Sequence, residues 1–380
     1  MDSSHMNATV LCGTVGNLAT EYRLHRQAQS LLAAGHSVDV AGFSDPRCPP
    51  GLSHWAGITL TLLSISRSAL PGTLFFLVFM FKMFRRARRK RPAVLYACDL
   101  PVLFPFALAK LLQGGRLYYD SREIFIEQAA VHNRPIKRFL WGLLERFAVR
   151  YADKSLAVCE SDRDFLRARY PSLAPAVVRN LPCFAPYRKS DALRRRFDIP
   201  EGVPVILFQG TFLESVGTVE LTRATALFKT GRLVLIGDGP ERPACEAAVR
   251  ELGLSDRVSL VPTVPFTELH PLTCSADIGC YTGKGEGLNL VNVLPNKVFE
   301  YAMAGLPMVL SDLPELRKIN EQYHVGVLLR EITLQAIADA VNGLLLDPDA
   351  RARYRANSLA MARELCWENE EKIFLSWFNT

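Results

Sequence analysis

The sequence lacks several patterns that mark other classes of protein. Its nine cysteines form no C-x-x-C pair and no zinc spacing, and most stand among apolar residues, which predicts reduced thiols. The apolar run Leu74–Phe84 is shorter than the ~20 residues that cross a bilayer, and it contains Lys82. We recognise no signal peptide and no nucleic-acid-binding motif. These absences predict a cytoplasmic protein that does not bind nucleic acid.

Acidic residues are scarce in the first half of the chain. Residues 1–200 hold 29 Lys and Arg against 15 Asp and Glu, whereas residues 201–380 hold 16 against 23. The basic first half predicts a contact with something anionic. With 380 residues, the chain is long enough for two domains that each have a core.

The segment Gly283–Glu315 predicts a loop, a helix, a turn and a strand. Pro295 suits the start of a helix, because its missing N–H would have no partner there. Gly305 is typical of the position just beyond a helix, and Pro307–Leu310 is apolar, as in a short buried strand. The predicted helix has an apolar stripe at helical spacing, formed by Val298, Phe299, Ala302 and Met303.

The start of this helix predicts an anion site. Unpaired N–H groups near Asn296 and Lys297, the positive end of the helix dipole and the Lys297 ammonium would attract a phosphate. Glu300, one turn later, could accept hydrogen bonds from a sugar diol. A nucleotide presents a phosphate and a diol together. On spacing alone, the alternative is a solvated Lys–Glu pair on a surface helix.

The pattern PNKxFEYxxAGxPxVxSDxPE, at residues 295–315, resembles the donor-binding signature of the retaining glycosyltransferases of family 4, which have the GT-B fold. Glu300 matches the second glutamate of that family's E-x7-E motif, but the first falls at Asn292. A branch of the family carries GLNN before LPNK, and Gly287, Leu288 and Asn289 resemble it. Weaker similarities extend from about residue 10 to residue 375.

The resemblance implies an α/β protein with two Rossmann-like domains facing a central cleft. We expect an acceptor-binding domain at residues 7–186 and a domain that binds the nucleotide-sugar donor at residues 200–366. A last helix within residues 367–380 would pack back on the first domain. The Pro- and charge-rich residues 186–204 would form the linker.

A βαβ unit opens the first domain. The strand Ala8–Cys12 is followed by a glycine loop with Gly13 and Gly16, and then by a helix over Glu21–Ala34. In GT-B enzymes the matching loop faces the cleft, so we predict Gly13 and Gly16 as cleft residues. The loop lacks a full GxGxxG, and the alternative is a plain tight turn.

Two polar turns follow later strands, at the edge where open α/β sheets bind ligands. Asp99 follows the strand Ala93–Ala97, and Arg122 and Glu123 follow the strand Arg116–Asp120. The second turn resembles the family's YD-x-HE-x-F, with Arg122 in place of the histidine. A guanidinium cannot act as a base at pH 7, but it can hold a phosphate or a carboxylate. We predict all three as catalytic residues; for the two acids the alternative is a turn or cap.

The second domain adds two glycine turns to the predicted donor site. Gln209-Gly210 resembles the family's YQG turn, and Gly239 belongs to a GDGP that matches the family. Relatives clamp the diphosphate with a cation where this chain has Val216. Either Lys297, Lys284 or Arg122 supplies the missing charge, or donor binding is weakened. The predicted donor-binding residues are Gly210, Gly239, Asn289, Asn296, Lys297 and Glu300.

The segment Leu74–Arg91 joins an apolar run to a cationic cluster. Such a helix could lie on an anionic membrane surface, and the alternative is a core helix with a solvated basic end. Nucleic acid is disfavoured because no aromatic residues are interleaved with the charges. Two D-x-D pairs, Asp162–Asp164 and Asp347–Asp349, open predicted helices, so we interpret them as caps and predict no metal site.

The sequence therefore predicts a retaining glycosyltransferase that moves a hexose from a nucleoside diphosphate sugar to an acceptor hydroxyl. It would need no cofactor and would work in the cytoplasm or at the inner face of the cytoplasmic membrane. Two alternatives are a GT-B sugar-nucleotide 2-epimerase and a non-catalytic nucleotide-sugar-binding partner of another transferase. Asn292, Val216 and Arg122 motivate the second alternative. The base, the sugar, the acceptor (glycan, glycolipid or small molecule) and the oligomeric state stay open.

Overall fold

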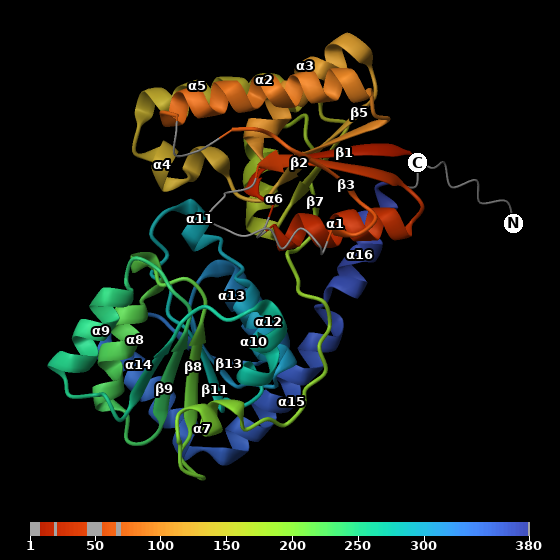
Figure 1. The fold of residues 1–380 in the computed structure, drawn as a ribbon. Coiled ribbons are helices and arrows are strands. Elements are labelled where there is room, and N and C mark those ends of the chain that lie inside the picture. The colour runs from red at the N-terminus through yellow and green to blue at the C-terminus, as the bar shows by residue number, and fades with distance from the viewer. Residues whose placement is uncertain (1–7, 19–20, 44–54, 66–69, 379–380) are drawn as a thin grey trace, which may run out of the picture. The chain divides into compact units, whose positions relative to one another are not determined.

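The computed structural model describes residues 8–18, 21–43, 55–65 and 70–378. The chain divides into two compact units (Figure 1). Unit 1 comprises Met1–Asn180 and Glu370–Thr380, and unit 2 comprises Leu181–Asn369. Each unit is a parallel sheet flanked by helices, which confirms the predicted fold class.

Unit 1 contains a sheet with the strand order β3-β2-β1-β4-β5-β6-β7. The strands are β1 (Thr9–Asn17), β2 (Ser37–Phe43), β3 (Thr59–Leu62), β4 (Val94–Cys98), β5 (Arg116–Ser121), β6 (Lys154–Ala157) and β7 (Ala176–Val177). The helices are α1 (Tyr22–Ala33), α2 (Gly72–Lys90), α3 (Leu100–Gln113), α4 (Ala129–His132), α5 (Pro135–Ala148), α6 (Glu160–Arg169) and the end of α16 (Trp367–Ser376). Strand order reverses between β1 and β4, and this switch point is where open parallel sheets bind ligands.

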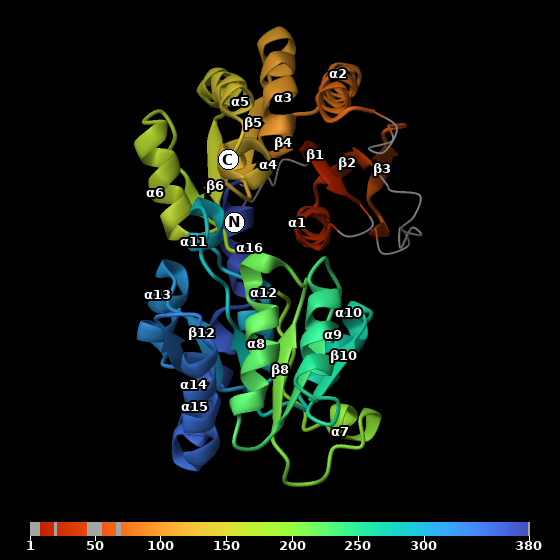
Figure 2. The ribbon, with the colours of Figure 1, turned by 90° about the vertical axis from the view of Figure 1, so that its left-hand side faces the viewer.

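Helices cover both faces of this sheet. α2, α3 and α5 lie side by side over one face (Figures 1 and 2), whereas α1 and the end of α16 cover the other. The central strand β4 is buried at every position, and its Tyr96 packs against Phe374 and Phe378 of the C-terminal segment. Strands covered on both faces are typically apolar along their whole length, as this one is.

Unit 2 has the strand order β10-β9-β8-β11-β12-β13. The strands are β8 (Val205–Gln209), β9 (Arg232–Ile236), β10 (Val258–Val261), β11 (Ile278–Tyr281), β12 (Met308–Ser311) and β13 (Gly326–Leu329). The helices are α7 (Ala192–Arg196), α8 (Thr218–Ala224), α9 (Arg242–Glu251), α10 (Phe266–Thr273), α11 (Leu288–Val291), α12 (Asn296–Met303), α13 (Pro314–Tyr323), α14 (Leu334–Leu346) and α15 (Pro348–Glu364). α8, α9 and α14 cover one face and α10, α12 and α15 the other (Figure 1). Its switch point lies between β8 and β11.

The predicted helix, turn and strand of the segment Gly283–Glu315 are confirmed as α12 and β12. Gly305 has φ +65°, and its N–H donates to the Ala302 carbonyl at 2.9 Å. The Leu306 N–H donates to the Tyr301 carbonyl at 2.9 Å, which completes a Schellman turn. Glycine ends this helix because a side chain would strain the left-handed conformation.

Two local predictions are wrong, and helix α3 was not predicted. Gly13 and Gly16 do not form a loop, because β1 continues to Asn17 with an irregular register against β2. The predicted linker, residues 186–204, contains α7, whose Leu193 is buried in the core of unit 2. α3 escaped prediction because it is apolar on most sides and contains Pro105, so no amphipathic stripe marks it.

Candidate functional site

Several of the predicted donor-binding residues meet at the switch point of unit 2, beyond the carboxyl end of β8. Gly210 follows β8 with φ +129°, and Lys297 lies in the first turn of α12. A Cβ atom added to Gly210 would lie 2.8 Å from the Lys297 Nζ, so the amine lies directly beside this glycine. A larger residue at position 210 would displace the lysine.

The Lys297 amine lies among aromatic rings. Its Nζ is 4.1 Å from the ring centroid of Phe208 and 5.2 Å from that of Tyr281. Loss of hydration lowers the pKa of Lys297 to about 7, although the nearby Glu300 carboxylate acts in the opposite direction. The ring faces also favour the charged form. An arriving phosphate would therefore meet an amine that is ready to take up a proton.

No side chain caps the start of α12 within the described chain. Pro295 is the N-cap residue, in an extended conformation, and it has no polar side chain to accept the first N–H groups of the helix. The Val298 N–H donates to the Pro295 carbonyl at 3.1 Å, and the N–H groups of Asn296 and Lys297 before it are donors available to a ligand. The uncapped helix start and the Lys297 amine together form a site that suits an anion.

The Glu300 carboxylate is held by Gln209, the last residue of β8. Gln209 Nε2 donates to Glu300 Oε2 at 2.5 Å, and Gln209 Oε1 accepts from the Thr273 hydroxyl at 2.8 Å. Because both ends of this buried amide are bonded, Gln209 fixes the orientation of Glu300. The sequence prediction assigned Gln209 only to a turn. The sequence signal that could have identified Gln209 is that it is the one polar residue at the end of an otherwise apolar strand.

Glycines allow the loops after β8 and β9 to touch through their backbones. A Cβ atom on Gly237 would lie 1.9 Å from the Gly210 carbonyl oxygen, and one on Gly239 would lie 2.5 Å from the Phe212 carbonyl oxygen. Both glycines also have positive φ angles, of +145° and +153°. Gly239, predicted to bind the donor, therefore has a packing role in shaping the loop.

Val216, which stands where relatives have a cation, belongs to the hydrophobic core of unit 2. Val216 ends a short 3-10 turn and is only 8% exposed. Lys284 is tied to the same turn through its N–H, which donates to the Ser215 carbonyl at 2.8 Å, while its Nζ pairs with Glu220 at 2.8 Å. Of the two lysines in unit 2 that could supply the charge, Lys297 lies beside Gly210 and Lys284 already has a carboxylate partner.

The two asparagines of the neighbouring segment lie on and just after α11. Asn289 is half-buried within this one-turn helix. Asn292, which replaces the first glutamate of the family motif, is the C-cap residue and is buried. The structure therefore places Asn289, but not Asn292, where a part of the side chain reaches the surface.

Asp99 lies at the switch point of unit 1, just beyond β4, in a strained conformation. Its φ of +67° and ψ of +166° fall in a region that essentially only glycine populates. Its Oδ1 accepts the N–H of Arg122 at 3.1 Å. Burial raises the pKa of the Asp99 carboxyl to about 7, although the Arg122 guanidinium acts to lower it. Asp99 is thus a candidate to exchange a proton near neutral pH.

Arg122 is ion-paired rather than open to a ligand. Its two terminal nitrogens both donate to Glu21 Oε2 at 2.6 Å. The Thr14 hydroxyl donates to the same oxygen at 3.4 Å. The sequence prediction missed Glu21, which precedes α1 and lies 101 positions before Arg122, because no local pattern joins them.

Gly13 and Gly16 have separate packing roles. A Cβ atom on Gly13 would lie 2.5 Å from Val102, so this glycine lets α3 approach β1. A Cβ atom on Gly16 would lie 2.1 Å from Glu21 Oε1, so Gly16 makes room for the carboxylate that holds Arg122. Glu123, predicted as catalytic, is exposed and accepts a hydrogen bond from Gln128 Nε2 at 2.8 Å.

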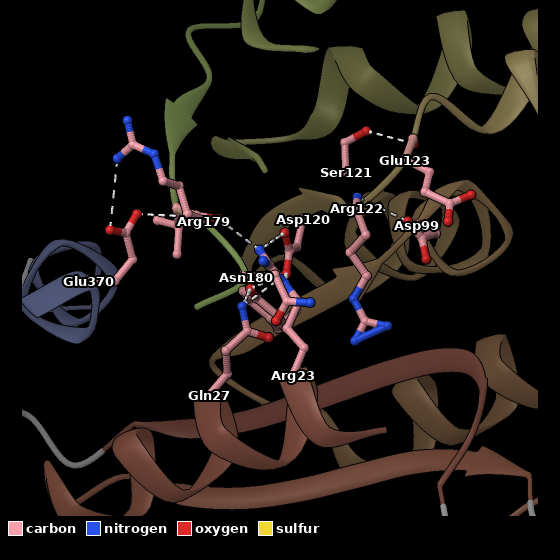
Figure 3. A network of polar contacts seen from close by, with 12 residues as sticks. Arg23, Gln27, Asp99, Asp120, Ser121, Arg122, Glu123, Arg179, Asn180 and Glu370 are labelled. Atoms are coloured by element: carbon pink, nitrogen blue, oxygen red, sulfur yellow. Dashed lines mark hydrogen bonds and ion pairs between the residues drawn. The ribbon is translucent and has the colours of Figure 1, made fainter. Parts of the chain in front are cut away.

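A buried polar network stands next to Arg122 (Figure 3). Asp120 accepts hydrogen bonds from Arg23 at 2.9 Å, from Gln27 at 3.0 Å and from the Tyr96 hydroxyl at 2.8 Å. Burial alone would raise the pKa of Asp120, but the Arg23 and Arg122 guanidinium groups hold it below its ordinary value. Arg23 also donates to the Val178 carbonyl at 3.1 Å. The network thus fixes α1 against the carboxyl ends of β5 and β7.

Comparison with known proteins identifies the family. The profile of the glycosyl transferase 4-like domain matches residues 19–182, and that of the glycosyl transferases group 1 matches residues 189–361. The chain belongs to the group 1 glycosyltransferases of family 4. This glycosyltransferase is 26% identical to the alpha-D-kanosaminyltransferase of Streptomyces kanamyceticus over 303 residues, which cover 74% of this chain and 75% of that protein.

The alignment with a second relative is shorter. The D-inositol 3-phosphate glycosyltransferase of Xylanimonas cellulosilytica is 31% identical over 52% of this chain and 48% of its own. Among solved structures, the sucrose-phosphate synthase of Thermosynechococcus elongatus has a TM-score of 0.80 at 16% identity, covering 98% of both chains. HepE of Anabaena, in complex with UDP-glucose, has a TM-score of 0.77 at 17% identity, covering 97% of this chain and 99% of its own. These structures confirm the GT-B fold.

Three further observations concern the described residues alone. None of their helices is long and apolar enough to cross a bilayer. The eight cysteines among them are free thiols, and seven of these are buried. Asp347 caps α15, with its carboxylate accepting the Ala350 N–H at 2.8 Å, as predicted, whereas Asp162 lies in the first turn of α6.

Proposed function

We propose that this glycosyltransferase moves a hexose from a nucleoside diphosphate sugar to an acceptor hydroxyl with retention of anomeric configuration. The observation that carries the proposal is the Lys297 amine beside Gly210, at the uncapped start of α12 and at a switch point. The UDP-glucose held by HepE supports a donor of this class.

In the proposed reaction, each residue acts on a defined part of the substrates. The acceptor oxygen attacks the anomeric carbon on the face from which the diphosphate departs, and the bond to the leaving oxygen breaks. Lys297 and the first N–H groups of α12 stabilise the charge that gathers on the diphosphate, more strongly in the transition state than in the ground state. Glu300, oriented by Gln209, accepts hydrogen bonds from the ribose hydroxyls.

The remaining predicted residues complete the proposal. Asn289 offers an amide to the hydroxyls of the transferred sugar. On the acceptor side, Asp99 has a pKa of about 7 and takes the acceptor proton, and the Glu21–Arg122 pair keeps the adjoining backbone in place. No metal or cofactor has a role in this proposal, because Lys297 and the helix dipole supply the positive charge. We further propose that the protein works in the cytoplasm, where free thiols persist.

A thermal-shift experiment tests the proposal first. A ligand that binds only the folded state raises the melting temperature, so saturating UDP, GDP or ADP should raise it by about 5 °C for one base and less for the others. The measurement is a melting curve with each nucleotide and its common sugars. The same series on Lys297→Met is the matched control. A flat response to every nucleotide would contradict the proposal.

Nucleotide binding should also take up protons. In the free protein Lys297 has a pKa of about 7, and a bound diphosphate should return it toward the ordinary lysine value. At pH 8 the uptake should be about 0.9 proton, and at pH 6 it should fall to about 0.1. Calorimetry in buffers with different ionisation enthalpies measures it. An uptake that persists in Lys297→Met would assign the proton to another group.

We also propose that α2 contacts a lipid surface. Its inner face is buried, but Leu74, Leu77 and Phe81 are 45%, 57% and 58% exposed. These residues are followed along the same side of the helix by Arg85 and Arg89, both exposed. Apolar residues that continue into cations along one side are typical of helices that lie in a membrane interface.

A further inference from the structure

Helix α5 exposes an apolar stripe to solvent. Ile136, Phe139, Leu140 and Leu143 are 77%, 65%, 53% and 50% exposed, and they are spaced as one face of a helix. The opposite, inner face of the helix is buried and carries Trp141 and Ala148. Half or more of each of these four side chains is therefore open to solvent among the described residues. Large apolar residues gathered on one exposed face mark an interaction surface.

The charges on α5 favour an anionic partner. The only acidic residue of α5, Glu145, is 1% exposed and accepts hydrogen bonds from the hydroxyls of Tyr119 and Tyr170. Its cations Lys137 and Arg146, in contrast, reach the surface, and Arg150 follows one turn beyond Arg146. A second copy packed on this face about a two-fold axis would bring like charges together.

A groove runs beside the stripe. It has a volume of 490 Å³ and is lined by apolar atoms of Phe139 and Leu143 together with Arg138, Arg146 and Arg169. Arg138 is neutralised by Glu127, whereas Arg169 donates only to the Tyr170 hydroxyl, at 3.0 Å, among the interactions of the described residues. The groove thus offers the guanidinium groups of Arg146 and Arg169 next to apolar surface, with the buried Glu145 carboxylate near Arg169. A phosphate attached to a hydrocarbon chain fits this lining, because the phosphate would meet the arginines and the chain would meet the apolar residues.

We infer that the α5 surface, made of this stripe and groove, binds the face of an anionic phospholipid bilayer. The stripe lies among the acyl chains at the interface, and Arg146 and Arg169 hold a lipid phosphate in the groove. α5 has 14 residues, which suits a helix lying in the interface rather than crossing the bilayer. The inference does not rest on transferase activity, and it involves a helix other than α2.

Co-sedimentation of the full chain with vesicles tests the inference. Vesicles of phosphatidylcholine alone are compared with vesicles that contain about 30% phosphatidylglycerol. We expect binding only to the anionic vesicles, and its loss as NaCl rises from about 50 to about 500 mM. Phe139→Ser with Leu140→Ser should weaken partitioning by at least about tenfold. Leu252→Ser, an exposed leucine in unit 2, is the matched control and should leave binding unchanged.

A second pair of variants tests the groove. Removing one basic residue near a membrane surface weakens binding by about fivefold, which is the loss expected for Arg150→Gln. Arg146→Gln should cost more, because Arg146 also lines the groove. Equal losses for the two would overturn the phosphate site.

Three results would overturn the α5 surface itself. The first is equal binding to neutral and anionic vesicles. The second is normal vesicle binding by the stripe variant, Phe139→Ser with Leu140→Ser, while Phe81→Ser on α2 abolishes vesicle binding. The third is a dimer in solution that the stripe variant converts to a monomer. An unchanged melting temperature of each variant shows that it is folded.

Discussion

Replacement of Lys297 by methionine should lower kcat for sugar transfer by about 10²–10³-fold while KM changes much less. Removal of one fixed donor to a developing negative charge has this magnitude in other enzymes. The methionine retains the apolar stem over Phe208 but cannot carry charge. The measurement is steady-state kinetics with the donor identified by thermal shift.

The split between kcat and KM is the informative part of this result. An interaction that strengthens only as the diphosphate departs affects kcat, whereas one that merely binds the donor affects KM. Lys229→Met, at an exposed lysine of unit 2, is the matched control and should be neutral. A Lys297→Met protein with unchanged kcat would remove Lys297 from the mechanism.

Replacement of Asp120 by alanine should destabilise the protein by about 3–5 kcal/mol. The substitution leaves the Arg23 guanidinium, whose side chain is 7% exposed, without its carboxylate partner. Loss of one partner of a buried ion pair costs this much because the remaining charge stays desolvated. Urea unfolding at pH 7 measures the difference. The exposed pair of Asp191 and Arg195 gives the control: Asp191→Ala should cost less than about 1 kcal/mol.

The effect should depend on pH in a defined direction. The pKa of Asp120 is lower in the folded state than in the unfolded state. Its contribution is therefore complete above the unfolded value of about 4, and it is lost as the pH falls through the lower folded value. The wild-type protein and Asp120→Ala should thus converge in stability only in acid below about pH 4. A constant difference down to pH 2 would show that packing, rather than charge, is responsible.

The sequence predicted the parts of the molecule that local patterns encode. Periodicity and helix signals predicted α12 with its terminal Gly305 and the strands before and after it. The family motifs predicted that each of the two domains has a parallel sheet. Lys297 and Glu300 were found in the same way, and they stay predictions as donor-binding residues. The carboxyl-end positions of Gly210 and Asp99 followed from the strands before them.

Contacts between distant segments could not be predicted. Glu21 pairs with Arg122, and Gln209 holds Glu300, because parallel strands bring their carboxyl ends to one edge, and the order of strands is not written in any one segment. Gly13 illustrates a related limit. It suggested a loop, but its role is to admit α3, a helix that carried no amphipathic signal. The role of Gly13 and the position of α3 both depend on which residues are buried once unit 1 has folded.

The two sheets share one plan, with strand order reversing between their first and fourth strands. That plan bears on how the enzyme can diverge. The positions at which this chain departs from its family, Arg122, Val216 and Asn292, all lie outside the paired strands, in segments that follow β5, β8 and β11. Changes there leave the hydrogen-bonded ladders intact. Substitutions at the carboxyl ends of the strands can therefore alter the binding of a donor or an acceptor while the strand pairing of each sheet is kept.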